Sequence, residues 1–328
     1  MNNRLTGLYA ATFTPMRSDG SLDLQQVPAM VSHLAKSGVA GIYVGGSTGE
    51  GMSLTSNERM ELTEAFIASA KDKMLVIAHV GHNSLAEARL LAQHAWNAGA
   101  DVISATAPSY YKIGSVRLLL ESMAELASAV PDAPFYYYHI PSLTGNEVSI
   151  PRFLEQAPTR IPSLAGIKYT APYVHEYQAA TTTCDGKYDV LWGTDEMLLS
   201  ALVVGAQGAI GSTYNISAPL NNSILTAFTD GDLATATGLQ QKSVDLIRVL
   251  LSYPFHAAMK SLLARQGIEC GPCRLPLGNL SEAEEKLLHQ TLDESGISNW
   301  LFDQQPPATI NKPHVSFGSS RSTTGVKK

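Results

Sequence analysis

Residues 41–58 have the sequence GIYVGGSTGEGMSLTSNE, which holds one repeating unit of the fold. The run GIYVG, which begins at Gly41, is short and contains β-branched and aromatic residues, as strands do. A glycine-rich loop follows it. Thr55 and Glu58 then have the spacing of a capping box, the side-chain pattern that begins a helix. The stretch therefore predicts a strand, a loop and a helix in that order.

The same order of strand and helix recurs along the chain to about residue 212. A second capping-box pattern, Ser84 with Glu87, opens a helical run that ends at Gly99. The expected strands are LYAATF from Leu8, GIYVG from Gly41, MLVIAHV from Met74, DVISAT from Asp101, PFYYYHI from Pro134, LAGIKY from Leu164, YDVLWG from Tyr188 and GAIGST from Gly208. Eight βα units favour a (β/α)8 TIM barrel, because a doubly wound open sheet has fewer strands and a glycine fingerprint after the first.

After the last expected strand the pattern is helical only. We expect helices over about 217–228, 232–252, 254–266 and 281–295, which together form a C-terminal helical extension packed on the barrel. Residues 304–328 consist largely of Pro, Ser, Thr and Lys with little to bury, so we expect a disordered tail there. The predicted organisation is a catalytic barrel over 1–216, a helical region over 217–303 and the tail over 304–328.

Composition and charge argue against several classes of partner. The chain has 23 Lys and Arg against 29 Asp and Glu, a net charge of −6. It lacks basic runs interleaved with aromatic residues, so a nucleic-acid partner is disfavoured. No stretch approaches the roughly 18 uninterrupted apolar residues of a membrane helix, and the N-terminus lacks the pattern of a signal peptide. We therefore expect a cytoplasmic protein that binds neither nucleic acid nor a membrane.

The cysteines and histidines predict neither a redox centre nor a metal site. Three cysteines suit a reducing compartment. Cys270 and Cys273 spell CGPC, as in thioredoxin-like sites, but Pro276 falls where the helix of such a site should continue. A chance occurrence is therefore favoured over a redox pair, and no second Cys or His pair has zinc-site spacing. His79 and His82 have no carboxylate companion nearby, so no metal is expected.

Residues able to do chemistry follow several of the expected strands. In a TIM barrel the catalytic groups come from the carboxyl ends of the strands and from the loops that follow them. The residues in those places are Ser47, Thr48, Tyr110, Tyr138, Lys168, Asp195, Glu196 and Ser212.

Lys168 is the most informative of these residues, because LAGIKYTAP places an amine at the tip of an apolar strand. Desolvation lowers the pKa of a lysine, which can then attack a carbonyl and form a Schiff base. A structural ion pair at the barrel top is an equally compatible interpretation. Tyr138 lies one strand away and suits general acid–base work. By strand alternation Tyr137 should face the opposite way, and Tyr136 should lie deeper than Tyr138.

Several motifs together carry a resemblance to a known family. The motifs are GGSTGEG, YYYHIPSLTG, GIKYT, GTDE and GAIGSTYN. In order and spacing they resemble the N-acetylneuraminate lyase and dihydrodipicolinate synthase superfamily of pyruvate-dependent class I aldolases, from about Leu8 to about Leu280, and most closely its lyase branch. The resemblance implies a TIM barrel with a helical C-terminal region, usually assembled as a homotetramer. It also implies a lysine Schiff base with the ketone of a small 2-oxo acid, and no metal or organic cofactor.

The resemblance also implies roles for individual residues. Lys168 resembles the Schiff-base lysine, and Tyr138 resembles the acid–base tyrosine. Ser47 and Thr48 match the pair that binds the pyruvyl carboxylate and joins a proton relay. Tyr110 resembles the tyrosine that completes this relay, often near a neighbouring subunit, and Tyr111 is the alternative.

Specificity within the family depends on other positions. Synthases that use aspartate semialdehyde carry an arginine where this chain has Leu143, and a leucine cannot hold a carboxylate. The places that bind a polyol chain in the lyases are matched by Thr170, Gly193, Asp195, Glu196 and Ser212. The implied activity is reversible cleavage of N-acetylneuraminate to N-acetylmannosamine and pyruvate. The alternatives are a related 2-keto-3-deoxy sugar acid aldolase or dehydratase, a dihydrodipicolinate synthase, and a non-catalytic protein of the same fold.

The Asp195–Glu196 pair has an alternative role, and the glycine-rich loop has a preferred anion. Asp195 and Glu196 stand in the first turn of an expected helix, where acidic residues are favoured by the helix dipole alone, so helix capping is the alternative role. The loop VGGSTGEG lacks the lysine and the spacing of a phosphate-binding P-loop. Because it faces the same barrel mouth as Lys168, a planar carboxylate is the anion that it suits best.

Overall fold

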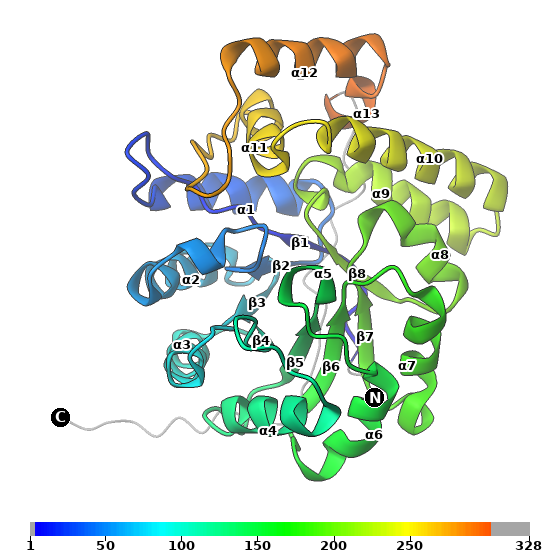
Figure 1. Ribbon diagram of the computed structural model, residues 1–328. Coiled ribbons are helices and arrows are strands. Elements are labelled where there is room, and N and C mark those ends of the chain that lie inside the picture. The colour runs from blue at the N-terminus through cyan, green and yellow to red at the C-terminus, as the bar shows by residue number, and fades with distance from the viewer. Residues whose placement is uncertain (1–3, 303–328) are drawn as a thin grey trace.

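The computed structural model describes residues 4–302. Eight parallel strands close into a barrel in chain order, which confirms the predicted TIM barrel (Figure 1). The strands are β1 (Gly7–Ala11), β2 (Gly41–Val44), β3 (Leu75–His79), β4 (Val102–Thr106), β5 (Phe135–His139), β6 (Leu164–Tyr169), β7 (Asp189–Trp192) and β8 (Gly208–Gly211). Every expected strand is present. The tail expected over 304–328 lies outside the described residues.

Helices connect the strands and extend beyond the last one. Between the strands lie η1 (Leu24–Gln26), α1 (Val27–Lys36), η2 (Gly51–Ser53), α2 (Ser56–Ala70), α3 (Leu85–Ala98), α4 (Val116–Ala127), α5 (Pro141–Thr144), α6 (Ile150–Gln156), η3 (Ala157–Thr159), α7 (Val174–Gly186), η4 (Asp195–Met197) and α8 (Leu198–Val203). After β8 come α9 (Tyr214–Thr229), α10 (Leu233–Leu250), α11 (Phe255–Arg265), α12 (Glu282–Glu294) and α13 (Ser298–Phe302).

The two predicted capping boxes have different outcomes. At α2 the Thr55 side chain accepts from the N–H of Glu58, and the Glu58 side chain accepts from the N–H of Thr55, so the box is complete. At α3 the Ser84 side chain accepts from the N–H of Glu87. The Glu87 carboxylate instead accepts from the Ser56 hydroxyl at 2.6 Å. A tertiary partner on α2 has therefore replaced the local one.

The first helix after β8 covers the barrel itself. α9 begins at Tyr214 rather than at the expected Ser217, which has non-helical backbone angles at a break next to Pro219. It packs against β1 and α8, and α10 packs in turn on α9, α11 and α12. α10 to α13 gather on one side of the barrel (Figure 1, yellow to orange). The division of the chain into domains at residue 216 stays a prediction.

Side chains on the strands alternate between two apolar clusters. Tyr136 and Tyr138 belong to the cluster inside the barrel, together with Tyr43. Tyr137 belongs to the larger cluster between the barrel and its helices. This confirms the expected facing of the three consecutive tyrosines. The register pairs Tyr138 of β5 with Lys168 of β6, so the two residues lie side by side at the carboxyl ends of their strands.

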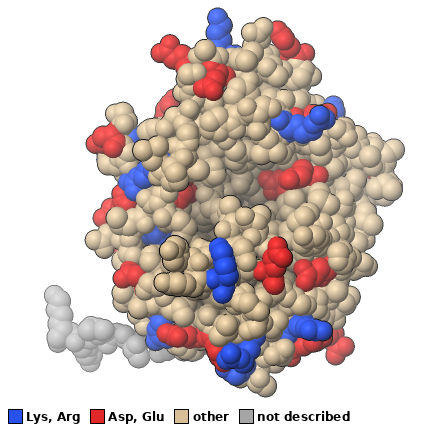
Figure 2. Space-filling view, in the orientation of Figure 1, with Lys and Arg blue, Asp and Glu red and all other residues tan. Residues whose placement is uncertain are grey.

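The outer surface carries charges of both signs. On the face shown in Figure 2, Lys and Arg side chains are scattered among Asp and Glu rather than gathered into one basic patch. Among the described helices, none is both long enough and apolar enough to cross a membrane.

Candidate active site

A cavity of about 250 Å³ opens at the carboxyl ends of the strands. Every candidate residue from the sequence except Tyr110 lines it: Ser47, Thr48, Tyr138, Lys168, Thr170, Gly193, Asp195, Glu196 and Ser212. These residues lie at the ends of β5 and β6 or follow β2, β6, β7 and β8, so the closure of the barrel brings together side chains that are far apart along the chain.

Lys168 is buried in this cavity without a counter-ion. Its side chain is 4% exposed. Its Nζ lies 4.0 Å from the centre of the Tyr138 ring and 4.3 Å from the centre of the Tyr43 ring. Within residues 4–302 it makes no ion pair and no hydrogen bond. The structural ion pair that the sequence left open is therefore not present. Burying an amine without a hydrogen-bonding partner costs free energy, so its position calls for a functional explanation.

Tyr43 and Tyr138 form an aromatic corner around this amine. Their rings lie 5.7 Å apart at 77°. The Tyr43 hydroxyl is hydrogen-bonded to Ser104 Oγ at 3.0 Å, and burial raises the pKa of Tyr43 well above its usual value. The Tyr138 hydroxyl makes no hydrogen bond with any residue that the structure describes. Of the two phenols, only Tyr138 therefore has a hydroxyl available to a bound molecule.

The loop after β2 presents unused donors to the cavity. Gly51 N–H donates to the Gly46 carbonyl at 3.1 Å, and Thr14 Oγ1 donates to the Gly49 carbonyl at 2.5 Å. These bonds fix the loop. The N–H groups of Ser47 and Thr48 donate to no acceptor in the described part of the chain. Consecutive free N–H groups in a turn are suited to bind an anion.

The hydroxyls at the two sides of the cavity meet across it. Thr48 Oγ1 and Ser212 Oγ lie 2.6 Å apart, so the loops after β2 and β8 are joined by a side-chain hydrogen bond. A bound carboxylate near Thr48 would therefore also lie close to the loop that carries Ser212.

Asp195 and Glu196 differ in what they contact. Asp195 Oδ2 accepts from the N–H of Thr213 at 2.8 Å and from its Oγ1 at 2.6 Å. Burial raises the pKa of Asp195 to about 6. The Glu196 carboxylate makes no hydrogen bond among the described residues. Neither side chain caps η4. Both residues stand in the first turn of η4, as the helix-dipole alternative requires. In addition, Asp195 joins the loops after β7 and β8, and Glu196 is available to the cavity.

Two glycines leave room for these side chains. A Cβ atom on Gly193 would lie 1.9 Å from Thr170 Oγ1, and a Cβ on Gly211 would lie 1.9 Å from Asp195 Oδ1. Thr170 Oγ1 is buried and has no hydrogen-bond partner among the described residues. Gly193 therefore makes space for the Thr170 hydroxyl at the edge of the cavity.

Tyr110 does not reach the cavity within one chain. It lies on the loop after β4 and is 76% exposed. Its N–H donates to Asn83 Oδ1 at 3.0 Å, and its ring meets that of the equally exposed Tyr111 at 90°. The resemblance implies a place for Tyr110 in the proton relay, but Tyr110 does not line the cavity of its own chain.

Residues from the C-terminal helices complete the cavity. Ile247 and Leu251 from the end of α10, with Phe255 and His256 from the start of α11, line it. His256 Nε2 donates to the carbonyl of Ser47 at 3.1 Å, and burial lowers its pKa. The sequence does not reveal these residues, because nothing local in a helical pattern shows which distant loop the helix will contact.

The structure does not support a redox centre at CGPC or a metal site at His79. Cys270 and Cys273 lie in the loop between α11 and α12, and burial raises their pKa values to about 12 and about 11. A reactive thiol needs the opposite shift. Within residues 4–302 no group of three or more His, Cys, Asp or Glu side chains is placed to hold a metal. His79 is buried between the Gly45 carbonyl and Thr106.

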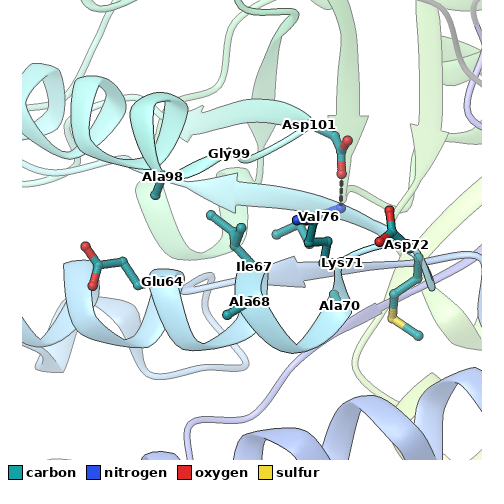
Figure 3. Close-up of a pocket in the computed structure, with 11 residues that line it drawn as sticks. Glu64, Ile67, Ala68, Ala70, Lys71, Asp72, Val76, Ala98, Gly99 and Asp101 are labelled. Carbon is teal, nitrogen blue, oxygen red and sulfur yellow. Dashed lines mark hydrogen bonds between the residues drawn. The ribbon is translucent and has the colours of Figure 1, made fainter. Parts of the chain in front are cut away.

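A second hollow, of about 550 Å³, lies between α2 and α3 at the other end of the barrel (Figure 3). Its polar lining comes from Glu64, Lys71, Asp72 and Asp101, and the Asp101 carboxylate accepts from the N–H of Val76 at 2.9 Å. It contains none of the candidate residues. In TIM barrels the amino ends of the strands serve stability and the carboxyl ends serve catalysis, so the smaller cavity around Lys168 is the candidate active site.

Comparison with known proteins shows the family of the chain. Residues 4–295 match the dihydrodipicolinate synthetase family. N-acetylneuraminate lyase A of Xenopus laevis is 40% identical over 278 residues, covering 84% of this chain and 91% of the relative. The human N-acetylneuraminate lyase is 39% identical over 295 residues, which cover 87% of this chain and 92% of the relative. The solved N-acetylneuraminate lyase (sialic acid aldolase) of Aliivibrio salmonicida superposes with a TM-score of 0.87 at 38% identity, covering 90% of this chain and 98% of that one.

Proposed function

The chain belongs to the dihydrodipicolinate synthetase family, and from this premise we propose that it is a Schiff-base aldolase that reversibly cleaves N-acetylneuraminate to N-acetylmannosamine and pyruvate. The proposal is supported by the relatives at about 40% identity, whose names specify this activity. The single observation that carries it is Lys168, a buried amine at the carboxyl end of β6 that borders a cavity and has no counter-ion among the described residues.

The proposed reaction begins at Lys168. Its Nζ attacks the C2 ketone of the bound 2-oxo acid, and loss of water gives an iminium ion. Tyr138, supported by Ser47, removes the proton of the C4 hydroxyl. The C3–C4 bond then breaks, its electrons pass to the iminium, and the aldehyde sugar leaves. Protonation of the remaining enamine at C3 and hydrolysis of the imine release pyruvate and restore Lys168. The residues present need no metal for this sequence of steps.

The two ends of the cavity suit the two ends of this substrate. The free N–H groups of Ser47 and Thr48, together with the hydroxyls of both residues, are proposed to bind the carboxylate next to the ketone. Thr170, Glu196 and Ser212, with Gly193 and Asp195 shaping the edge, are proposed to bind the hydroxyls of the polyol chain. Leu143 lines the same cavity and offers no group for a second carboxylate, which supports a lyase over a dihydrodipicolinate synthase.

Assembly and location are part of the proposal. Tyr110 is exposed in the single chain, so its proposed place in the proton relay requires a neighbouring subunit, and we propose a homotetramer in which Tyr110 lies near another subunit's site. The three cysteines are free, which supports a cytoplasmic location.

Reductive trapping tests the chemistry at Lys168. The protein is incubated with pyruvate and borohydride, digested and analysed by mass spectrometry. We expect one reduced pyruvate adduct, on Lys168, and loss of turnover in Lys168→Ala. An enzyme that keeps full activity while Lys168 stays unmodified would contradict the mechanism.

A substrate panel tests the specificity. Pyruvate release is measured from N-acetylneuraminate and, in parallel, from several 2-keto-3-deoxy sugar acids. We expect the highest kcat/KM with N-acetylneuraminate. Preferred cleavage or dehydration of a shorter acid would instead support the related aldolase or dehydratase, since those enzymes would share the pyruvate end of the site and differ at the sugar end.

A further inference from the structure

Glu50, within the loop after β2, combines an unfavourable backbone conformation with full burial. Its φ and ψ are 55° and 27°, in the left-handed region that side chains other than glycine rarely adopt. Its side chain is 0% exposed. The left-handed region is unfavourable for an L-residue, and a buried carboxylate is costly unless it is paired. Specific contacts must therefore hold this residue in place.

Those contacts come from the C-terminal region of the chain. Lys260 of α11, itself 3% exposed, places its Nζ 2.8 Å from Glu50 Oε1. The same Nζ donates to the Pro272 carbonyl at 2.8 Å. The N–H of Arg274 donates to Glu50 Oε2 at 2.8 Å. Glu50 is thus the point at which α11 and the loop after it are fastened to the loop after β2.

The same helix holds the loop at a second point. His256 lies one turn before Lys260 on α11, so the two side chains project from the same face of the helix. His256 Nε2 donates to the Ser47 carbonyl at 3.1 Å, and the N–H of Glu50 donates to that carbonyl at 3.1 Å. The Ser47 carbonyl therefore has two donors, one from α11 and one from Glu50.

Fixing the Ser47 carbonyl also fixes the N–H of Thr48, because both belong to one planar peptide group. In a trans peptide the N–H points opposite to the C=O. The carbonyl of Ser47 is engaged by Glu50 and His256, and the N–H of Thr48, on the other side, has no acceptor among the described residues. The orientation of this N–H in the cavity thus depends on the position of Glu50.

We infer that Glu50, held by its ion pair with Lys260, is a positioning residue that orients the Ser47–Thr48 peptide for the carboxylate of the 2-oxo acid. The inference rests on the proposed function, since it names the residue that prepares the carboxylate end of that site. Glu50 does not touch the substrate, and it acts through the peptide that does.

The inference also gives the CGPC stretch a role that needs no thiol chemistry. The next residue, Arg274, supplies the N–H that binds Glu50. Its guanidinium donates to the carbonyls of Gly20 and Ser53 and forms an ion pair with Glu58. The CGPC stretch and Arg274 therefore connect the C-terminal region to the loop after β2.

The test is pyruvate trapping with borohydride at increasing pyruvate concentration in Glu50→Gln. We expect the pyruvate concentration that half-saturates adduct formation to rise roughly tenfold, as for the loss of one hydrogen bond to a charged group. The maximal adduct on Lys168 should stay unchanged. A purely structural defect would do the reverse, lowering the maximal adduct through loss of folded protein and leaving the half-saturating concentration as it was.

Two further variants keep the test decisive. Glu50→Gln combined with Lys260→Met removes both buried charges, so it should fold even where an unpaired lysine would not. It should show the same raised half-saturating concentration. Ser261→Ala is the matched control, because it removes the hydrogen bonds of α11 to Glu285 and His289 without touching Glu50, and it should bind pyruvate normally.

The outcomes separate this inference from the proposed function. A wild-type protein that traps no pyruvate would overturn the proposed function, and the inference with it. A wild-type protein that traps pyruvate, beside Glu50 variants with unchanged half-saturation, would overturn the inference alone. An equal rise in Ser261→Ala would also overturn it, because the effect would then be a general loosening of α11.

Discussion

Two lysines in this molecule are almost equally buried, and their surroundings distinguish them. Lys260 is paired with Glu50 at 2.8 Å and donates to a backbone carbonyl. Lys168 makes no ion pair and no hydrogen bond among the described residues, and its Nζ lies over the ring faces of Tyr43 and Tyr138. The paired lysine is suited to a structural role. The unpaired one, at the edge of a cavity, is suited to react with a carbonyl.

The Tyr43 ring is expected to stabilise the iminium formed at Lys168. Tyr43→Leu removes one of the two aromatic faces around Nζ, and a cation over an aromatic ring gains about 1 kcal/mol, so we expect pyruvate trapping to weaken by roughly tenfold or less. The measurement is the equilibrium fraction of trapped adduct at a fixed pyruvate concentration.

Tyr43→Phe is the matched control for this prediction. It keeps the ring and removes only the hydroxyl that bonds to Ser104. We expect near-normal trapping in this variant. Equal losses in the Phe and Leu variants would show that the hydroxyl, rather than the ring face, supports the site.

The candidate catalytic residues at strand ends could be predicted from the sequence. The residues that contact or position them could not. The sequence pointed to Lys168 and Tyr138 because a polar group at the tip of an apolar strand is unusual. Tyr43 gave no such signal, since an aromatic residue inside a strand usually packs in the core. In the sequence Glu50 is one polar residue in a loop. Its burial and its partner Lys260 depend on chain folding over a long distance.

At the scale of elements, the loop between α11 and α12 shows how a motif depends on its context. CGPC in a thioredoxin-like site lies at a helix N-terminus, which lowers the pKa of the first thiol. Here no helix begins within CGPC, and burial raises the pKa of Cys270 to about 12. The thiols therefore stay protonated and unreactive at neutral pH.

Cys270→Ser is accordingly expected to leave lyase activity near normal. The substitution keeps the backbone carbonyl that accepts from the N–H of Met16, and it removes only a buried thiol. The measurement is the rate of pyruvate release in reducing and non-reducing buffer. A loss of activity in the variant, or a dependence of the wild-type rate on the reductant, would argue for a redox role after all.

Helices with a capping pattern in the sequence form where that pattern predicts them. Contacts with neighbouring elements change their capping bonds and their first residues. Thr55 and Glu58 cap α2 reciprocally as predicted. Glu87 does not complete its box because Ser56 of the neighbouring helix binds its carboxylate. α9 starts before the expected Ser217 because it packs on β1, a contact that no local pattern encodes.

At the scale of the whole molecule, the two ends of the barrel hold carboxylates in different settings. Asp195 lies at the carboxyl ends of the strands, beside the cavity. Asp189 lies at the amino end of β7, where it accepts from the Tyr136 hydroxyl at 2.9 Å and from the N–H of Leu5 at 3.0 Å. Burial raises the pKa of Asp189 to about 6. This carboxyl is therefore harder to ionise in the folded protein than in the unfolded chain.

The raised pKa of Asp189 predicts a pH-dependent cost to stability. A carboxyl whose folded pKa exceeds its unfolded value favours the folded state at low pH, and that contribution is lost as pH rises from about 4 to about 6. Asp189→Asn stays neutral and keeps an acceptor oxygen, so it should be the more stable form at neutral pH, by on the order of 2 kcal/mol. At about pH 4 the two proteins should differ little. The measurement is denaturant unfolding across this range.

The difference in unfolding free energy between the Asp189→Asn variant and the wild type should grow as pH rises from about 4 to about 6. A constant difference for Asp189→Asn would show that its carboxyl does not titrate between the folded and unfolded states in this range.

The sequence by itself determined the order of strands and helices, the TIM barrel, and the position of Lys168 and Tyr138 at neighbouring strand ends. These follow from local periodicity and from the geometry of a closed parallel sheet. Only the tertiary structure decided that Lys168 lacks a counter-ion among the described residues, that Tyr110 lies outside the cavity of its own chain, and that α11 fastens the loop after β2 through Glu50. Each of these depends on contacts between segments far apart in the chain, and such contacts leave no periodic trace in either segment.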